Sequence, residues 1–221
     1  MTSWTALREG FDAFTRRLPL LLGVVLVLLA VQQVIDLLIP DSLVWFESIV
    51  TVIILSPLYA GQYLIALKVV RREPVVFKEL FAGMSQIGTI VGAYVLVTLL
   101  TVLGSFALVI PGIIVALMYS FTLIRFLDPK EGARTLRATE ALRESARITR
   151  GYRGTLFGIG FLLGIPLAIL IILQTVSVYN PLFPSWIAEI IALFSGALFF
   201  GPVQAASYMV VYDHAVTHPR G

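Results

Sequence analysis

The chain contains no cysteine and only two histidines among its 221 residues. Without cysteine there is no disulfide, no thiolate metal site and no cysteine nucleophile. His214 and His218 both fall near the end of the sequence, so a Ser-His pair or a histidine-rich metal site elsewhere has no residues to use. We therefore expect a protein that is not an enzyme and that uses no metal or other cofactor.

Charged residues are also scarce. They make up 13% of the sequence, against 58% hydrophobic residues and a mean hydropathy of +0.94. This composition lies far outside the range of soluble proteins. A membrane-spanning helix needs about 20 mostly apolar residues, and the apolar runs supply six such segments. We expect an all-α, polytopic membrane protein that forms a single integral membrane domain over residues 1–221 and binds no nucleic acid.

The six expected spans cover about Leu18–Ile39, Leu43–Val70, Ile87–Leu103, Pro111–Leu127, Thr155–Val178 and Trp186–Tyr212. The first follows Arg16 and Arg17, as the core of a cleaved signal peptide would. Its length is that of a span, however, and the shorter core of a signal peptide is the less favoured alternative.

Three amphipathic segments precede the first, third and fifth spans. In residues 3–17 the apolar stripe consists of Trp4, Leu7, Phe11, Phe14 and Leu18. After Glu73-Pro74 it consists of Phe77, Leu80, Phe81 and Met84. In residues 129–150 it consists of Ala138, Ala141, Leu142, Ser145, Thr149 and Tyr152. Asp128-Pro129-Lys130-Glu131 has the form of a helix start, so we expect a helix from Pro129 to Arg150. All three should lie at the membrane surface.

The positive charges predict the orientation. In the six-span arrangement all sixteen Lys and Arg fall on the side of the amphipathic helices, where nine acidic residues leave a net charge of +7. The other side holds four acidic residues, Asp36, Asp41, Glu47 and Glu189. By the positive-inside rule we expect a protein of the cell (inner) membrane with both termini in the cytoplasm.

The order of amphipathic helix, span, turn and span occurs three times. This pattern predicts parallel repeat units at residues 1–72, 73–128 and 129–221. The sequence ALREG at residues 6–10 is echoed by ALRES at 141–145, and the second span of each unit has a proline followed by a tyrosine. The alternative to a genuine repeat is that any six-span protein has basic helices in the cytoplasmic segments that connect its spans.

Few polar groups fall inside the expected spans. Gln62, Gln174 and Gln204 could line a groove between units, or they could only hydrogen-bond neighbouring helices. Prolines in the spans could act as hinges or as fixed kinks. The candidate groove or kink residues are Pro57, Gln62, Pro111, Pro166, Pro202 and Gln204.

Arginines crowd the third amphipathic segment. The candidate residues for binding lipid headgroups are Arg134, Arg137, Arg143, Arg147, Arg150 and Arg153. Each such residue contributes about 1 kcal/mol of attraction near an anionic membrane surface. Topology alone also requires positive charge at this place, and both interpretations stay open.

Four short stretches carry a resemblance to a known family. They are PGIIVALMYS at residues 111–120, ALRESARITRGYRGTLFG at 141–158, SPLYAGQY at 56–63 and GPVQAASY at 201–208. Together they resemble the membrane domain of glycerophosphoryl diester phosphodiesterases and related stand-alone bacterial inner-membrane proteins of uncharacterised function. In fused members this domain anchors a catalytic barrel. The sequence holds no such barrel, so the resemblance implies no phosphodiesterase activity here.

Two functions remain as alternatives. The first is a non-enzymatic membrane protein, or membrane scaffold, that binds or organises lipid or a lipid-like amphiphile. Its partners would be membrane lipids, including anionic ones, with a homo-oligomer or a partner membrane protein left open. The second is a permease or channel for a small solute, which the lack of ionisable groups near the middle of the bilayer disfavours.

Overall fold

All the elements in the computed structural model are helices over the residues it describes, which are 1–131, 136–179 and 198–218. The α-helices are α1 (Ser3–Arg16), α2 (Leu18–Leu38), α3 (Val44–Arg71), α4 (Ile87–Ala107), α5 (Val109–Met118), α6 (Ala138–Thr149), α7 (Arg153–Tyr179) and α9 (Gly201–Thr217). Short 3-10 helices are η1 (Asp41–Leu43), η2 (Phe77–Gln86), η3 (Ile124–Phe126) and η4 (Pro129–Glu131). The predicted all-α class is confirmed.

Helix α1 begins with a reciprocal cap. The Thr2 hydroxyl accepts the Thr5 N–H at 3.3 Å, and the Thr5 hydroxyl accepts the Thr2 N–H at 3.0 Å, which satisfies two backbone donors that a helix start leaves open. The helix ends at Arg16, and α2 starts two residues later, with Pro19 in its first turn, where proline needs no N–H partner. The predicted amphipathic helix and first span are confirmed as helices.

The buried side of α1 is narrower than its predicted stripe. Ala6, Gly10, Ala13 and Phe14 face the protein and are buried. Phe14 is the buried aromatic residue of the stripe, whereas Trp4 and Phe11 are 67% and 41% exposed. Helix α1 therefore packs on the protein through its small residues, while the exposed aromatic residues lie between this buried face and the polar face.

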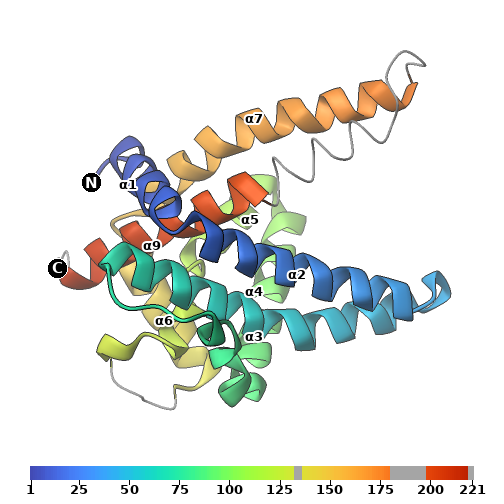
Figure 1. Ribbon diagram of the computed structural model, residues 1–221, viewed down its shortest axis with the longest axis horizontal. Coiled ribbons are helices and arrows are strands. Elements are labelled where there is room, and N and C mark those ends of the chain that lie inside the picture. The colour runs from blue at the N-terminus through green and yellow to red at the C-terminus, as the bar shows by residue number, and fades with distance from the viewer. Residues whose placement is uncertain (132–135, 180–197, 219–221) are drawn as a thin grey trace.

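Helices α2 and α3 form a long antiparallel pair (Figure 1). With 28 residues α3 is about 42 Å long, more than the hydrocarbon core of about 30 Å. It continues through Pro57 and ends where Arg72 adopts a left-handed conformation at φ 58°. The predicted second span is confirmed as a helix of spanning length.

The second amphipathic segment is the 3-10 helix η2. With three residues per turn, positions three apart share one face, so Leu80 and Gly83 are buried on α3. Phe81 and Met84 of the predicted stripe are exposed instead. Phe77 is exposed as well, so three of the four residues of the stripe lie at the protein surface, where an interfacial helix would meet lipid.

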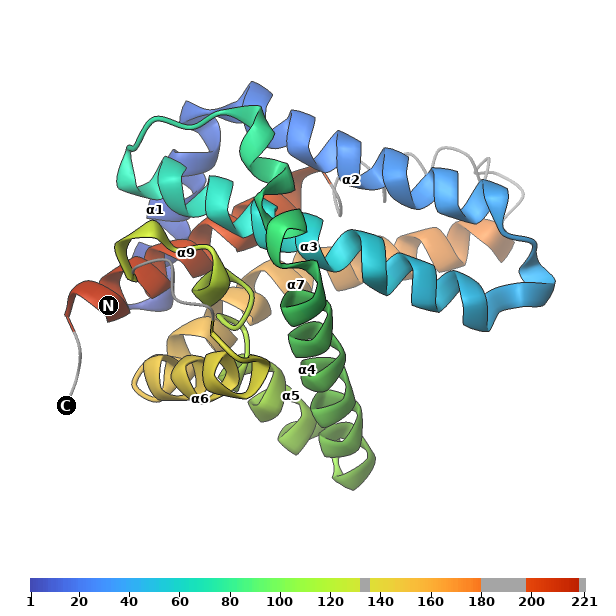
Figure 2. The same ribbon diagram turned by 90° about the horizontal axis from the view of Figure 1, so that it is seen from below.

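Helices α4 and α5 form a hairpin that leaves the α2–α3 pair at a large angle (Figure 2). The fourth predicted span, Pro111–Leu127, is not one helix: α5 ends at Met118, and turns and η3 follow. Ten residues span about 15 Å, half of the hydrocarbon core. The residues after α5 pack inside the protein, since Phe121 and Ile124 are fully buried.

Helix α6 begins at Ala138, so the prediction of a helix from Pro129 was wrong at its start. Of the residues described between Asp128 and α6, Pro129–Glu131 form the 3-10 helix η4, and the Asp128 carboxylate accepts the Lys130 N–H at 3.1 Å as a cap would. Ala141, Leu142, Ser145 and Thr149 of the predicted stripe are buried. The bundle covers this stripe: the Ser145 hydroxyl donates to the Met118 carbonyl at 2.9 Å.

The chain bends by 86° between α6 and the start of α7. If α7 crosses a membrane, α6 therefore lies nearly parallel to its surface, as the predicted order of surface helix and span requires. Helix α7 continues through Pro166. Only α9, the second part of the sixth predicted span, is described, with Pro202 in its first turn.

Glycines allow two close helix contacts that organise the bundle. A Cβ at Gly10 would lie 2.6 Å from the backbone of Ser207, so α1 packs directly on α9. A Cβ at Gly61 would lie 2.8 Å from the Leu80 Cα, where η2 packs on α3. The main core lies among these elements and includes Leu58, Ile65, Met209 and Tyr212.

Within the described residues, three helical stretches are long and apolar enough to cross a membrane, and α6 with α7 forms a fourth if counted as one bent span. These apolar helices indicate a membrane-embedded protein. The six spans and the threefold repeat are not confirmed and stay predictions. Both termini lie at the same end of the molecule (Figure 1).

Candidate functional site

Three of the predicted headgroup residues share the exposed face of α6. Arg143, Arg147 and Arg150 are exposed, opposite the buried face that contains Ala141 and Ser145. Where the structure is described, none of the three arginines is in an ion pair. Their charges are therefore available to an anion at the surface.

The other predicted headgroup residues differ in their surroundings. Arg137 is exposed at the start of α6, and Arg153 is half-buried at the start of α7. Arg134 lies outside the described residues. The structure therefore groups three of the six residues on one face.

The acidic residues of α6 do not pair with its arginines as their spacing suggests. Glu140 accepts the backbone N–H of Arg137 at 3.0 Å and so caps the helix. Glu144 accepts hydrogen bonds from the buried Arg125 of η3, one of them from Nε at 2.8 Å. Among the described residues, neither carboxylate therefore forms an ion pair with Arg143 or Arg147.

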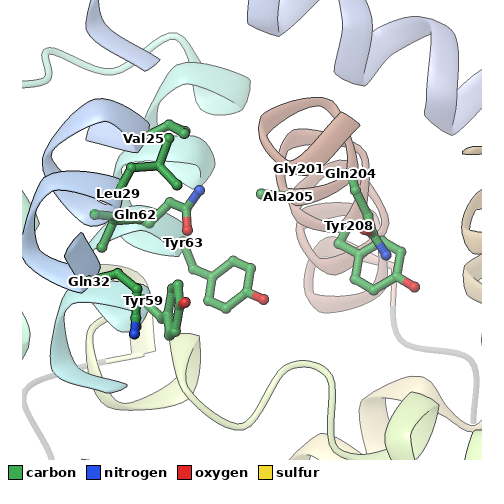
Figure 3. Close-up of a pocket in the computed structure, with 11 residues that line it drawn as sticks. Val25, Leu29, Gln32, Tyr59, Gln62, Tyr63, Gly201, Gln204, Ala205 and Tyr208 are labelled. Carbon is green, nitrogen blue, oxygen red and sulfur yellow. The ribbon is translucent and has the colours of Figure 1, made fainter. Parts of the chain in front are cut away.

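A cavity of about 390 Å³ lies between α2, α3 and α9 (Figure 3). It brings together Gln62 and Gln204, which are 142 positions apart in the sequence. We call it the polar cavity; its lining is Val25, Leu28, Leu29, Gln32, Tyr59, Gln62, Tyr63, Gly201, Gln204, Ala205 and Tyr208. The side chain of Gln174, the third glutamine considered for a groove, is outside the described part.

None of the four candidate prolines is among the residues that line the cavity. Pro57 is buried in α3, where η2 approaches it at Gly83. Pro202 is buried in the first turn of α9. Pro111 lies in the first turn of α5 and Pro166 inside α7. A hinge role for any of them stays a prediction.

The sequence did not reveal a buried ionic cluster near the C-terminal ends of α3 and α9. Its members are Arg71, Arg125, Asp128, Glu144, Tyr212 and Asp213. Arg71 donates to both oxygens of Asp128, at 2.6 Å and 3.1 Å, and through Nε to Asp213 at 2.6 Å. One arginine thus joins α3, α9 and the segment before η4.

Tyr212 connects the two halves of this cluster. Its hydroxyl donates to Asp128 at 2.9 Å and accepts from Arg125 at 3.2 Å. Arg125 also forms an ion pair with Glu144, which ties η3 to α6. Only Arg125, an arginine near the end of an apolar run, signalled this arrangement in the sequence, because a buried cation requires a partner.

Asp128 is held in its charged form. Burial raises its pKa, but hydrogen bonds from Arg71, the Lys130 N–H and Tyr212, together with the Arg71 charge, have the larger combined effect and lower it. Each of the three acids of the cluster accepts a hydrogen bond from an arginine. No group of three or more metal-ligating side chains occurs in the part of the chain that is described.

No family model, curated protein or solved structure matches this chain. The resemblance to the membrane domain of glycerophosphoryl diester phosphodiesterases therefore stays a prediction from the sequence.

Proposed function

We propose that this protein is a non-enzymatic, multi-pass protein of the inner membrane that binds or organises lipid, with α6 as its contact to anionic headgroups. The observation that carries the proposal is the placing of Arg143, Arg147 and Arg150 on one exposed face of a helix bent by 86° from α7. A helix that lies along the membrane surface next to the end of a span is at the level of the lipid phosphate groups.

The energetics favour phosphate as the partner. Three unpaired arginines near an anionic surface contribute about 1 kcal/mol each, and a guanidinium matches phosphate with two parallel hydrogen bonds. The bundle already holds the opposite face of α6, so little further ordering is needed on binding.

The orientation and the assembly belong to the same proposal. The sixteen basic residues, which the six-span arrangement puts on one side, support a cytoplasmic location of α6 and both termini. The threefold repeat and the kinship with the phosphodiesterase membrane domain are proposed on the sequence alone. A homo-oligomer or a partner membrane protein remains compatible with the exposed apolar face of α4.

The alternative function is a permease or channel for a small solute. It is favoured by the polar cavity, where glutamines and tyrosines meet within a membrane protein. It is disfavoured because, in the part of the chain that the structure describes, no acid or base of the kind that usually drives coupled transport lines this cavity.

The test is to change Arg143, Arg147 and Arg150 together to Gln. Ten Arg and three Lys remain to set the orientation, so the variant should insert and fold. Anionic lipid that copurifies with the protein, measured by quantitative mass spectrometry, should fall several-fold. The difference from wild type should shrink as salt rises, because salt screens exposed charges.

A matched control changes Arg8, Arg16 and Lys78 to Gln. These exposed residues lie on α1 and η2, so the control removes the same charge from elsewhere on the basic side. It should retain anionic lipid as wild type does. Equal retention by all three proteins at low salt would show that the α6 arginines act only as topology signals.

A further inference from the structure

The polar cavity has two chemically different walls. Val25, Leu28 and Leu29 of α2 form an apolar wall, and Gln32, whose amide donates to Asp36, continues the lining along the same helix. Across it, Tyr63 points from α3 toward α9, and Gln204 and Tyr208 lie on α9 (Figure 3). A ligand that fills this space must therefore offer hydrocarbon on one side and hydrogen-bonding groups on the other.

Some of the polar groups at this cavity have no protein partner. Over the described residues, the Gln62 amide and the hydroxyls of Tyr59 and Tyr63 make no hydrogen bond. In a bilayer such groups cannot turn to bulk water, and an unsatisfied polar group is costly. Something other than protein is needed to satisfy them.

Among the described residues, the lining contains no Lys, Arg, Asp, Glu or His. A phosphate or carboxylate brought here would lose its water shell without gaining a cation, which is a large penalty. Amides and phenols can both donate and accept, so they fit a head that carries hydroxyl and carbonyl groups. The cavity also lies within the usual size range of small-molecule sites.

We infer that the polar cavity binds an uncharged amphiphile with a hydroxyl-bearing head, held by Gln62, Tyr63 and Gln204, with its hydrocarbon against α2. This site is separate from the arginines of α6. Its ligand is uncharged, whereas the α6 arginines would bind anionic lipid. It rests on the proposed function only in requiring a lipid-binding membrane protein.

The probe is a monoacylglycerol with a photoreactive diazirine in its acyl chain. It is a neutral amphiphile whose head carries both hydroxyl groups and an ester carbonyl. The protein is placed in phosphatidylcholine nanodiscs, irradiated, digested and mapped by mass spectrometry. Labelling is expected on peptides from α2, α3 or α9. Label spread evenly over exposed apolar faces such as α4 would overturn the inference.

Three single-chain competitors separate the contributions of head and chain. Mono-oleoylglycerol should suppress the labelling. Methyl oleate has the same chain without hydroxyls, and oleoyl lysophosphatidate adds a phosphate to the same glycerol ester; both should compete at least tenfold less well. Equal competition by methyl oleate would show that the site binds only the acyl chain, which contradicts the inference. Stronger competition by lysophosphatidate would overturn the preference for an uncharged head.

Variants link the labelling to named side chains. Gln62→Leu with Gln204→Leu should weaken competition by mono-oleoylglycerol about tenfold. Gln33→Leu is the matched control, because Gln33 is exposed on α2 and bonds Asp36 at 3.3 Å outside the cavity. If the double variant fails to fold, Tyr63→Phe removes one hydroxyl and should weaken competition several-fold. Unchanged competition in the folded variants would refute the site.

The two proposals fail independently. The variant with Arg143, Arg147 and Arg150 changed to Gln should keep wild-type labelling by the neutral probe. Loss of anionic lipid in that variant without any cavity labelling would defeat the inference alone. Cavity labelling with unchanged anionic lipid would defeat the α6 proposal alone.

Discussion

At the residue scale, the buried cations are the most constrained side chains of this protein. Arg71 and Arg125 lie among apolar helices, with side chains 2% and 5% exposed. Each is balanced by a carboxylate, and the Tyr212 hydroxyl links the two pairs. Such a cluster adds little net stability over apolar packing, but removing one partner leaves an uncompensated buried charge.

We predict that Asp128→Asn lowers stability at neutral pH by about 3 kcal/mol, within the range for breaking a buried ion pair. The folded pKa of Asp128 lies below its ordinary value. Its stabilisation is therefore complete above the unfolded pKa of about 4 and is lost as pH falls through the folded value. Thermal midpoints of wild type and variant in detergent should converge below about pH 4.

Glu73→Gln is the control for this experiment. Glu73 pairs with Lys130 at 3.7 Å, and both side chains are partly exposed, so its loss should cost less than about 1 kcal/mol. A destabilisation by Asp128→Asn that stays constant down to pH 3 would contradict the assigned role of the carboxylate.

At the element scale, small residues decide which helices touch. In α1 the face that contacts α9 carries Ala6, Gly10 and Ala13, while the aromatic face remains exposed. In α3 the contact with η2 occurs at Gly61. Close backbone approach replaces the large apolar contacts of a soluble core, as expected where lipid competes for apolar side chains.

We predict that Gly61→Ala destabilises the protein by about 2 kcal/mol or more. Its Cβ would overlap the Leu80 backbone, which cannot move as a flexible side chain would. Gly92→Ala on α4 is the matched change, since no atom lies within 4 Å of a Cβ there. It should be neutral or stabilising by up to about 1 kcal/mol, because alanine favours helices.

Thermal denaturation of both variants in the same detergent measures this contrast. Equal midpoints for Gly61→Ala and Gly92→Ala would mean that η2 does not pack tightly on α3.

At the scale of the whole molecule, the direction of the α4–α5 hairpin is the main departure from the expected bundle (Figure 2). The natural chain has no cysteine, so single cysteines report topology without background. We predict that Ser42→Cys and Ser105→Cys react with a membrane-impermeant maleimide added outside intact cells, and that Thr139→Cys reacts only after permeabilisation. All three positions are exposed on the protein.

The pattern of labelling separates orientation from span number. Reaction at Thr139 but not at Ser42 would reverse the orientation. Reaction at Ser42 with protection at Ser105 would show that α4 does not cross the membrane, and the six-span prediction would then fail.

Local signals explain which elements could be predicted. Helix α1 and the long apolar helices of the first, second and third predicted spans were found because apolar length, helical period and caps act within a few residues of the chain. The period did not reveal that η2, which packs on α3, is a 3-10 helix. It failed after Met118, where an apolar run forms turns because neighbouring helices cover it.

By itself, the sequence determined that the chain is helical and apolar enough for a membrane, since composition and run length need no knowledge of partners. Only the tertiary structure decided which distant polar groups meet. Arg71 and Asp213 are bonded at 2.6 Å, and Gln62 and Gln204 share one cavity. Such pairs lie far apart along the chain, and no local pattern encodes them, because their proximity depends on how whole helices pack.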